Sequence, residues 1–215
     1  MLDNIFEIVW SIPAVLIAIT FHEYCHGMMA YKMGDPTAAE AGRLTLNPLA
    51  HLDPIGTLML ILFRFGWAKP VPVNFNRLNH PKRDMIYVSL AGPVVNVIIA
   101  VIFALILRLS YYLIGQTNIT QNSSFFNLLV TLLRGWVIFL QTGVIINLAL
   151  SIFNLIPVPP LDGSKILLGL LPNPYAYKFY KLESYGPIIL LILVLSGIIG
   201  KVLFPIVFFL FRFLV

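Results

Sequence analysis

Apolar residues occur along this chain in long runs, and polar residues are confined to short stretches between them. A helix needs about 20 consecutive apolar residues to cross a bilayer. The runs that reach this length cover residues 5–33, 85–114, 127–155 and 185–215. Gly197, Gly200 and Pro205 interrupt the last run. We therefore expect three uninterrupted helices and then either one kinked helix or, as we favour, a span followed by an interfacial helix.

The connection between the first two predicted helices, residues 34–84, is too apolar for an ordinary loop. Residues 57–63 are apolar but too few to cross a bilayer as a helix. Pro70 and Pro72 then oppose helix formation and favour an extended backbone. A re-entrant or β-hairpin segment embedded in the membrane fits this pattern, provided that protein or a wet cavity satisfies its backbone. A loop lying on the bilayer surface is the alternative.

The composition is typical of a polytopic membrane protein. Of the 215 residues, 59% are hydrophobic and 11% are charged, and the mean hydropathy is +0.91. A soluble domain of this length could not hide so much apolar surface. We predict one all-α membrane domain, residues 1–215, with four to five transmembrane helices and the embedded segment after the first. The net charge of +5 does not indicate nucleic-acid binding, because the basic residues concentrate in loops.

Lysine and arginine residues are distributed unevenly between the connections. Residues 115–126, after the second predicted helix, carry no charge. The connections before and after hold Lys32, Arg43, Arg64, Lys69, Arg77, Lys82, Arg83, Lys165, Lys178 and Lys181. Because basic loops stay in the cytoplasm, we place the N-terminus and residues 115–126 outside. The first apolar run has no basic segment before it and no small-residue cleavage site, so we expect a retained helix rather than a signal peptide.

Three ionisable side chains, His22, Glu23 and His26, interrupt the apolar run of the first predicted helix. Ionisable groups at membrane depth are costly and therefore mark candidate functional sites. Residues i and i+4 share one face of a helix, so both imidazoles can bind one metal ion, with Glu23 placed to act on a metal-bound water. A chance spacing of satisfied polar groups is the structural alternative. Cys25, the single cysteine, excludes a thiolate-rich zinc site, and we expect it to pack.

Catalytic zinc sites usually have three protein ligands and a water, so the two histidines leave one ligand to be found. The candidates are His51, Asp53, His80, Asp84 and Asp162. Asp162 is favoured because it follows the third predicted helix directly, at the membrane depth predicted for the histidines. Prolines precede it in segment 156–163, so we expect an extended backbone at Asp162 and a turn at Gly163. We expect His51 and Asp53 to be solvated loop residues.

The motif His22-Glu23-Tyr24-Cys25-His26, together with residues 154–163, resembles the site-2 protease family of intramembrane zinc metalloproteases. Further matching blocks are residues 42–48, 68–74 and 91–96. The resemblance implies that His22, His26 and Asp162 bind Zn²⁺ and that Glu23 is the catalytic acid/base. It also implies that Asn154 helps to bind the substrate peptide or its developing oxyanion. The chain is similar to the compact prokaryotic members without PDZ or CBS domains, which implies a location in the cell (inner) membrane.

Two further asparagines lie within predicted helices. Asn147 is seven residues before Asn154 and hence on the same helix face. It could contribute to the site or only bond a neighbouring helix. Asn96 follows a Gly-Pro block, Gly92-Pro93, that lets helices approach closely, and we expect a structural role for it.

These features predict an intramembrane zinc endopeptidase that cuts membrane-protein or signal-peptide-like substrates within the lipid bilayer. A transporter or ion-relay bundle that uses the histidines is one alternative. It should carry ionisable groups on several spans or an internal repeat. The second and third predicted spans carry Arg108 and Arg134, both in their outer halves, and we find no repeat. A zinc-binding but proteolytically inactive scaffold is the other alternative, and the intact Glu23 opposes it.

Overall fold

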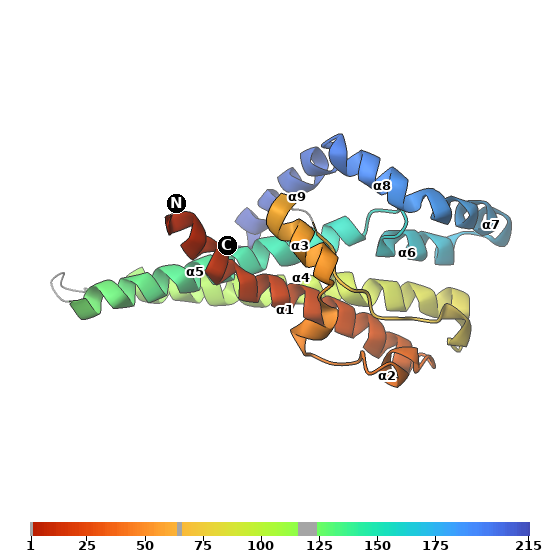
Figure 1. Ribbon diagram of the computed structural model, residues 1–215, viewed down its shortest axis with the longest axis horizontal. Helices are drawn as coiled ribbons and strands as arrows, with labels where there is room; N and C mark the ends of the chain where they lie inside the picture. The colour runs from red at the N-terminus through yellow and green to blue at the C-terminus, as the bar shows by residue number, and fades with distance from the viewer. Residues whose placement is uncertain (1, 64–65, 116–123) are drawn as a thin grey trace.

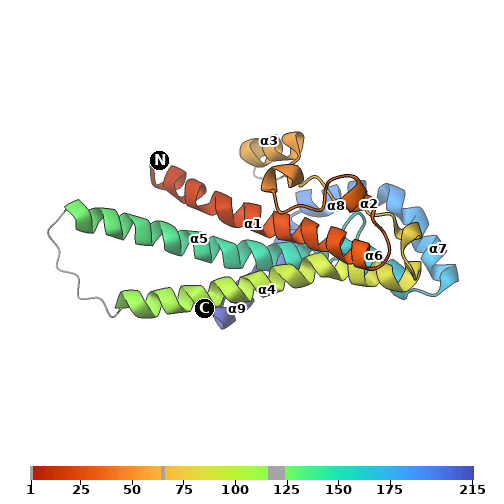
Figure 2. The ribbon, with the colours of Figure 1, turned by 90° about the horizontal axis from the view of Figure 1, so that it is seen from below.

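Three long helices frame the molecule in the computed structural model, which describes residues 2–63, 66–115 and 124–215. They are α1 (Leu2–Lys32), α4 (Pro81–Gly115) and α5 (Ser124–Asn154). They run alongside one another in Figure 1 and in Figure 2, and each is long and apolar enough to cross a membrane. Helix α4 begins before its apolar run, because Pro81 suits the first position of a helix and the polar turn after it continues the helix.

The C-terminal part folds as two helices, α8 (Gly186–Leu195) and α9 (Ile198–Leu214). The chain bends by 71° between them. The bend falls at Gly197, whose φ of 72° lies in the left-handed region that favours glycine. Residues 173–195 and α9 together are apolar enough to form one broken span, so the described residues give three spanning helices and up to four. Four is the lower end of the predicted range.

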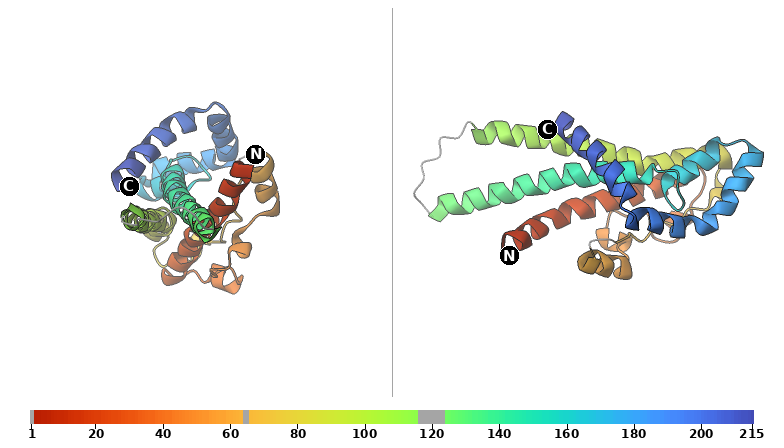
Figure 3. Two further views of the ribbon diagram at one scale, coloured as in Figure 1. Left: turned by 90° about the vertical axis from the view of Figure 1, so that its left-hand side faces the viewer. Right: turned by 90° about the horizontal axis from the view of Figure 1, so that it is seen from above.

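The core of the bundle lies where α4, α5 and α9 meet. Its buried residues are Ala100, Ala104, Val144, Leu148, Leu203 and Val207. Small residues let helix backbones approach closely, which is how helices pack when lipid surrounds them. Helix α9 returns toward the long helices in Figure 3, and the Phe213 carbonyl accepts a hydrogen bond of 3.1 Å from Arg108. The backbone of α9 therefore binds an arginine that the sequence places within a span.

The connection between α1 and α4 consists of short helices and open chain. Its helices are α2 (Thr37–Glu40), η1 (Pro48–His51), α3 (Pro54–Phe63) and η2 (Phe75–Arg77). The apolar residues 57–63 lie in α3, whereas residues 66–74 are not helical. Within the described part of this connection, the β-structure is one isolated bridge between Leu52 and Ala68. That part forms no β-hairpin, and the re-entry of α3 into the membrane stays a prediction.

A buried carboxylate fastens the open chain to the end of α1. The Asp35 side chain is fully buried. It accepts hydrogen bonds from the backbone N–H of Thr37 at 3.0 Å and of Asn74 at 2.6 Å. Hydrogen bonds to an ionised acceptor are about twice as strong as neutral ones. This contact holds residues 66–74 along the C-terminal turns of α1.

Two short helices follow the proline-rich segment, α6 (Asp162–Leu170) and α7 (Asn173–Leu182), and η3 (Glu183–Tyr185) comes after them. The backbone is extended at Leu161, but Asp162 begins α6, so the expectation of an extended backbone at Asp162 is wrong. No proline follows Pro160 in this stretch, and nothing further opposes a helix. Gly163 makes no turn: it lies within α6, where a Cβ would meet the Leu155 carbonyl oxygen at 2.2 Å.

Candidate metal centre

One turn of α1 and the start of α6 bring His22, His26 and Asp162 together. The Nε2 atoms of the two histidines lie 3.0 Å apart, and each lies 3.2 Å from Oδ2 of Asp162. The histidines are 5% and 9% exposed, and the Asp162 side chain is 19% exposed. The three side chains form a group that could hold a metal ion.

The distances between these ligand atoms fit a tetrahedral zinc shell. With metal–ligand bonds of about 2.0–2.1 Å, the edges of such a tetrahedron measure about 3.3 Å. The observed edges of 3.0, 3.2 and 3.2 Å come close to that value. Oδ2 of Asp162 is also buried without a hydrogen-bond partner, which is costly for a carboxylate oxygen unless a cation binds it. Two imidazoles and one carboxylate, with a fourth position for water, suit catalytic zinc.

Each imidazole is oriented by an oxygen on α4. The Nδ1 atom of His22 lies 2.6 Å from Oδ1 of Asn96, and that of His26 lies 2.7 Å from the Val88 carbonyl. Because both partners are acceptors, Nδ1 carries the proton on each ring. Both Nε2 lone pairs are then free to bind a metal, which is the usual arrangement for metal-binding histidines.

The orientation of His22 is set by a chain of amides that crosses three helices. Asn96 donates through Nδ2 to Oδ1 of Asn147 at 2.7 Å and to the Ala18 carbonyl at 3.1 Å. Asn147 in turn donates to the Gly143 carbonyl at 2.7 Å. These bonds leave Oδ1 of Asn96 as the acceptor that faces His22. Asn96 is thus part of the site's support, a role that the sequence analysis missed, and Asn147 bonds a neighbouring helix.

Replacing Asn96 by leucine should weaken metal binding, because it removes the acceptor for His22 while filling a similar volume. Losing such an outer partner typically costs 10–100-fold in metal affinity, and we expect a loss of about that size. Competition for zinc with a chelator of known affinity measures it. Asn127→Leu, at an exposed position of α5, is the control. Equal zinc affinity in Asn96→Leu and the wild type would show that Asn96 only packs.

Gly92 provides the space in which the two imidazoles sit. A Cβ at this position of α4 would lie 2.4 Å from Nε2 of His26 and 2.6 Å from Cε1 of His22. Such distances do not occur between real atoms, so the rings or the helices would have to move. The predicted close approach of helices at the Gly-Pro block thus falls at the metal centre itself.

We expect Gly92→Ala to lose most of its zinc, because the added methyl group occupies the space of the ligand atoms. Metal analysis of the purified variant after dialysis measures this. Gly115→Ala is a matched control on the same helix, since a Cβ there meets nothing within 4 Å. A normal zinc content in Gly92→Ala would mean that the imidazoles bind no metal in the arrangement described.

The Asp162 carboxylate is ionised at neutral pH, as a metal ligand must be. Helix α6 lies outside the three spanning helices. Burial raises the pKa of the Asp162 carboxyl, but hydrogen bonds donated by His22 and His26 when they are protonated outweigh this effect and lower the pKa to about 2. A bound cation would take the place of those protons. The site therefore presents one negative charge to a cation.

Glu23 is held beside the ligands by the open chain between α3 and η2. Its Oε2 accepts a hydrogen bond of 2.8 Å from the backbone N–H of Val71. A backbone N–H bonded to a carboxylate fixes the direction of the side chain. A carboxylate fixed next to a metal-binding group is the combination that hydrolysis with general acid–base catalysis requires.

Two of the other ligand candidates precede α3: His51 is the last residue of η1, and Asp53 comes directly before α3. His51 is fully buried, with Nε2 at 2.8 Å from the Thr45 carbonyl, so the expectation of a solvated residue is wrong for it. It is buried because η1 packs against α1. Asp53 is half-buried and accepts a hydrogen bond of 2.7 Å from the Gly56 N–H at the beginning of α3. Neither belongs to the metal-binding group.

His80, Asp84 and Asn154 also lie outside that group. Asp84 lies in the first turn of α4 and is fully buried. It accepts a hydrogen bond of 2.8 Å from the backbone N–H of His80, the residue just before the helix. Asn154 is the last residue of α5, and its Nδ2 donates to the Leu150 carbonyl at 2.9 Å. Its predicted part in substrate binding stays a prediction.

Comparison with known proteins agrees with this geometry. Residues 10–194 match the sequence profile described as Peptidase family M50. The chain belongs to peptidase family M50. The resemblance to site-2 proteases is thereby confirmed, and the protein is a zinc metalloendopeptidase of that family.

Several relatives carry names that agree with M50 membership. YwhC of Bacillus subtilis (strain 168), named as a proposed zinc metalloprotease, is 39% identical over 198 residues, or 91% of this chain and 84% of YwhC. Rip2 of Mycobacterium tuberculosis (strain ATCC 25618 / H37Rv), named in the same way, is 28% identical over 94% of this chain and 73% of Rip2. Zinc metalloprotease MJ0392 of Methanocaldococcus jannaschii is 26% identical over 90% of this chain and 45% of that protein. No solved structure matches the chain.

Proposed function

We propose that this M50 peptidase is an intramembrane endopeptidase that hydrolyses peptide bonds in or near the transmembrane segments of membrane-protein or signal-peptide-like substrates. The observation that carries the proposal is the group formed by His22, His26 and Asp162. Two of its members lie on α1, a helix apolar enough to span a membrane. A metal centre on such a helix is useful for bonds that are themselves in the bilayer.

His22, His26 and Asp162 would hold the zinc ion, and Glu23 would move the proton. When bound, zinc polarises the scissile carbonyl and lowers the pKa of water to about 7. The Glu23 carboxylate takes the proton from the attacking water and then gives it to the leaving amine. The Val71 N–H keeps the carboxylate directed while it does so.

Asn154 is our candidate for contact with the substrate. Its amide group bonds the Leu150 carbonyl at the end of α5, which is also the end nearest in sequence to Asp162. A substrate carbonyl, or the oxyanion that develops from it, would receive the same Nδ2–H in place of the helix carbonyl. This exchange costs little, because one hydrogen bond replaces another.

The cytoplasmic half of an inner membrane is the proposed location of the site. Basic residues gather at the end of the bundle where α1 ends and α4 begins, and α6 and α7 lie at that end in Figure 1. The positive-inside rule places this end in the cytoplasm. We include in the proposal that α3 re-enters the membrane beside the spans.

A cysteine introduced at Gly115, in a Cys25→Ser background, should react with a membrane-impermeant maleimide on intact cells. A cysteine at Lys178 of α7 should react only after permeabilisation. Both positions are exposed, so accessibility of the side chain does not bias the comparison. The reverse labelling would place the metal centre in the opposite half of the membrane.

Proteolysis in a defined membrane tests the function. Purified protein in liposomes, mixed with single-span reporters, should cut them at bonds inside or next to the span. A zinc chelator should abolish cleavage, and added zinc should restore it. Mass spectrometry of the products locates the bond. Cleavage confined to water-exposed loops, or ion flux without proteolysis, would contradict the proposal and favour a surface protease or a relay.

A further inference from the structure

A cavity of about 630 Å³ lies between η2, the first turn of α4, α6 and α7, at the end of the bundle that carries the metal centre. The side chains that matter most in its wall are Phe75 from η2, Lys82 from α4, Lys165 from α6, Ala176 and Tyr180 from α7, and Glu183 from η3. The cavity is outside the proposed catalytic group, and none of the roles described so far uses it.

Two segments that line the cavity are close along the chain to residues of the proposed catalytic site. Lys165 follows Asp162 by one turn of α6, which is roughly 4.5 Å along the helix axis. Val73, also in the wall, follows Val71 by two residues, which is at most about 7 Å of extended chain. Because Val71 bonds Glu23, the same open chain borders both the acid/base candidate and the cavity.

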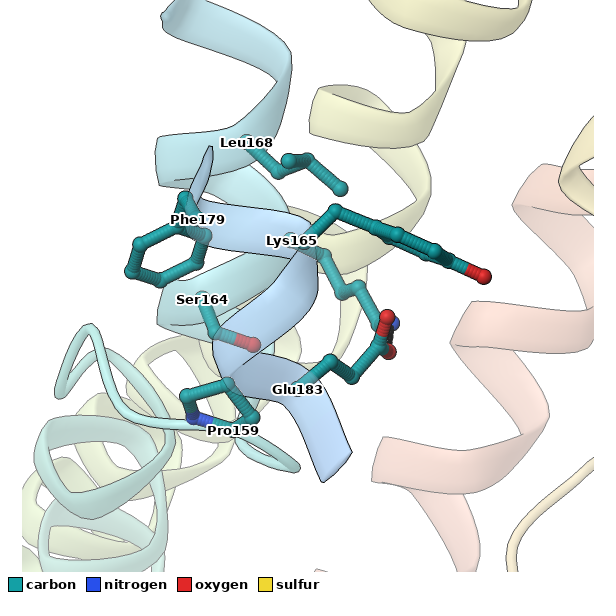
Figure 4. Close-up of a pocket in the computed structure, with 7 residues that line it drawn as sticks. Pro159, Ser164, Lys165, Leu168, Phe179 and Glu183 are labelled. Carbon is teal, nitrogen blue, oxygen red and sulfur yellow. Dashed lines mark hydrogen bonds and ion pairs between the residues drawn. The ribbon is translucent and has the colours of Figure 1, made fainter. Parts of the chain in front are cut away.

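One wall is held in place by an ion pair between α6 and η3. Figure 4 shows the side chains of Lys165 and Glu183 directed toward each other, and these two groups form an ion pair. The Lys165 ammonium also lies 5.9 Å from the ring centre of Phe75. Lys165 is therefore already neutralised, and it joins three sides of the cavity without offering a free charge.

Lys82 is the cation that the cavity can offer to a ligand. Its ammonium donates to Oδ1 of Asn173, an uncharged group, at 3.2 Å. Among the contacts of the described residues, none joins Lys82 to a carboxylate. A carboxylate that enters the cavity would supply the missing countercharge.

We propose that this cavity is a substrate subsite, which holds the water-exposed flank of the substrate next to the scissile bond and favours an acidic residue there. The inference rests on the proposed function. An extended peptide advances about 3.3 Å per residue, so two to four residues span about 7–13 Å, which is enough for a chain leaving the metal centre to pass the nearer walls and enter the cavity. A preference for an acidic flank would also select a minority of substrates, because the cytoplasmic flanks of most transmembrane helices are basic.

Filling the cavity tests the subsite. Ala176→Trp should lower kcat/KM for a reporter with a full flank by about tenfold, whereas a reporter truncated after the scissile region should be cut at the wild-type rate. Tyr175→Trp is the control, because Tyr175 is exposed on α7 and does not line the cavity. Equal cleavage of the full-flank reporter by Ala176→Trp and the wild type would overturn the proposal, as would an equal loss on both reporters.

Disulfide crosslinking tests the subsite without requiring the substrate to be cleaved. In a Glu23→Gln, Cys25→Ser background, a cysteine at Ala176 should form a disulfide with a cysteine placed two to four residues from the scissile bond. A cysteine at the exposed Leu105 of α4 should not. If the wild type cuts nothing but this crosslink forms, the proposed function fails and the binding site stands. If no crosslink forms at Ala176, the subsite is wrong even if cleavage is normal.

The acidic preference is tested at Lys82. Wild-type KM should be about threefold lower for an acidic than for a neutral flank, which corresponds to about 0.65 kcal/mol and lies within the range of exposed ion pairs. Lys82→Gln should remove this difference, and Lys82→Glu should reverse it toward a basic flank. Lys178→Gln, on the exposed part of α7, should keep it. An unchanged preference in Lys82→Gln would overturn the proposed selection.

Discussion

Glu23→Gln should abolish proteolysis and leave the zinc content unchanged. Glutamine keeps the shape of the side chain and can still accept the hydrogen bond that Val71 gives to Glu23. It cannot take a proton from water, and general acid–base catalysis is worth about 10²–10⁴-fold. We therefore expect kcat to fall by that factor, measured on a membrane-anchored reporter with parallel metal analysis.

Glu7→Gln is the matched control, since Glu7 lies on the same helix but is exposed near its N-terminal end. It should change neither activity nor zinc. Asp162→Ala provides the contrast, because losing one of three ligands should reduce both. Strong proteolysis by Glu23→Gln would show that another group moves the proton, and the relay and scaffold alternatives would then be tested next.

The sequence was sufficient to predict an all-helical membrane protein and three residues that the structure brings together as a group able to hold a metal ion. The reason lies in the cost of ionisable groups among apolar residues. Histidines at positions 22 and 26 are four residues apart in an apolar helix and so share one face of it, which makes their spacing informative. Asp162 could be chosen from five candidates because the end of a span fixes its depth in the membrane.

The local structure around these residues was harder to predict. Asp162 begins a helix and His51 is buried, and both outcomes depend on packing between distant segments. Asn96 has the same difficulty, since an asparagine in an apolar helix can bond any neighbouring carbonyl. Its contact with His22 spans 74 positions in the chain. An informative pattern was present, because Asn96 follows Gly92 by four residues and so shares its face of α4.

The arrangement of the site explains why its ligands come from different parts of the chain. Helix α1 carries Glu23 and two of the three proposed ligands, helix α6 carries the third, and α4 lies against both helices. Gly92, Val88 and Asn96 on α4 shape and orient the imidazoles, although α4 contributes no ligand of its own. Three residues that are not proposed ligands therefore hold the ligands in place, and such outer partners contribute to the metal affinity of a site.

The double replacement His22→Ala/His26→Ala should remove zinc altogether. The wild type should hold about one zinc per chain, and two of three ligands are lost in the variant, so metal content after dialysis should approach zero. His80→Ala is the control, because the His80 side chain is 64% exposed and lies outside the group. The helices should persist, since the core of the bundle lies between α4, α5 and α9. Circular dichroism can verify this in the same samples. Full retention of zinc by the double variant would mean that the ion binds elsewhere. The proposed catalytic role of Glu23 would then also be wrong, because it depends on a metal bound beside Glu23.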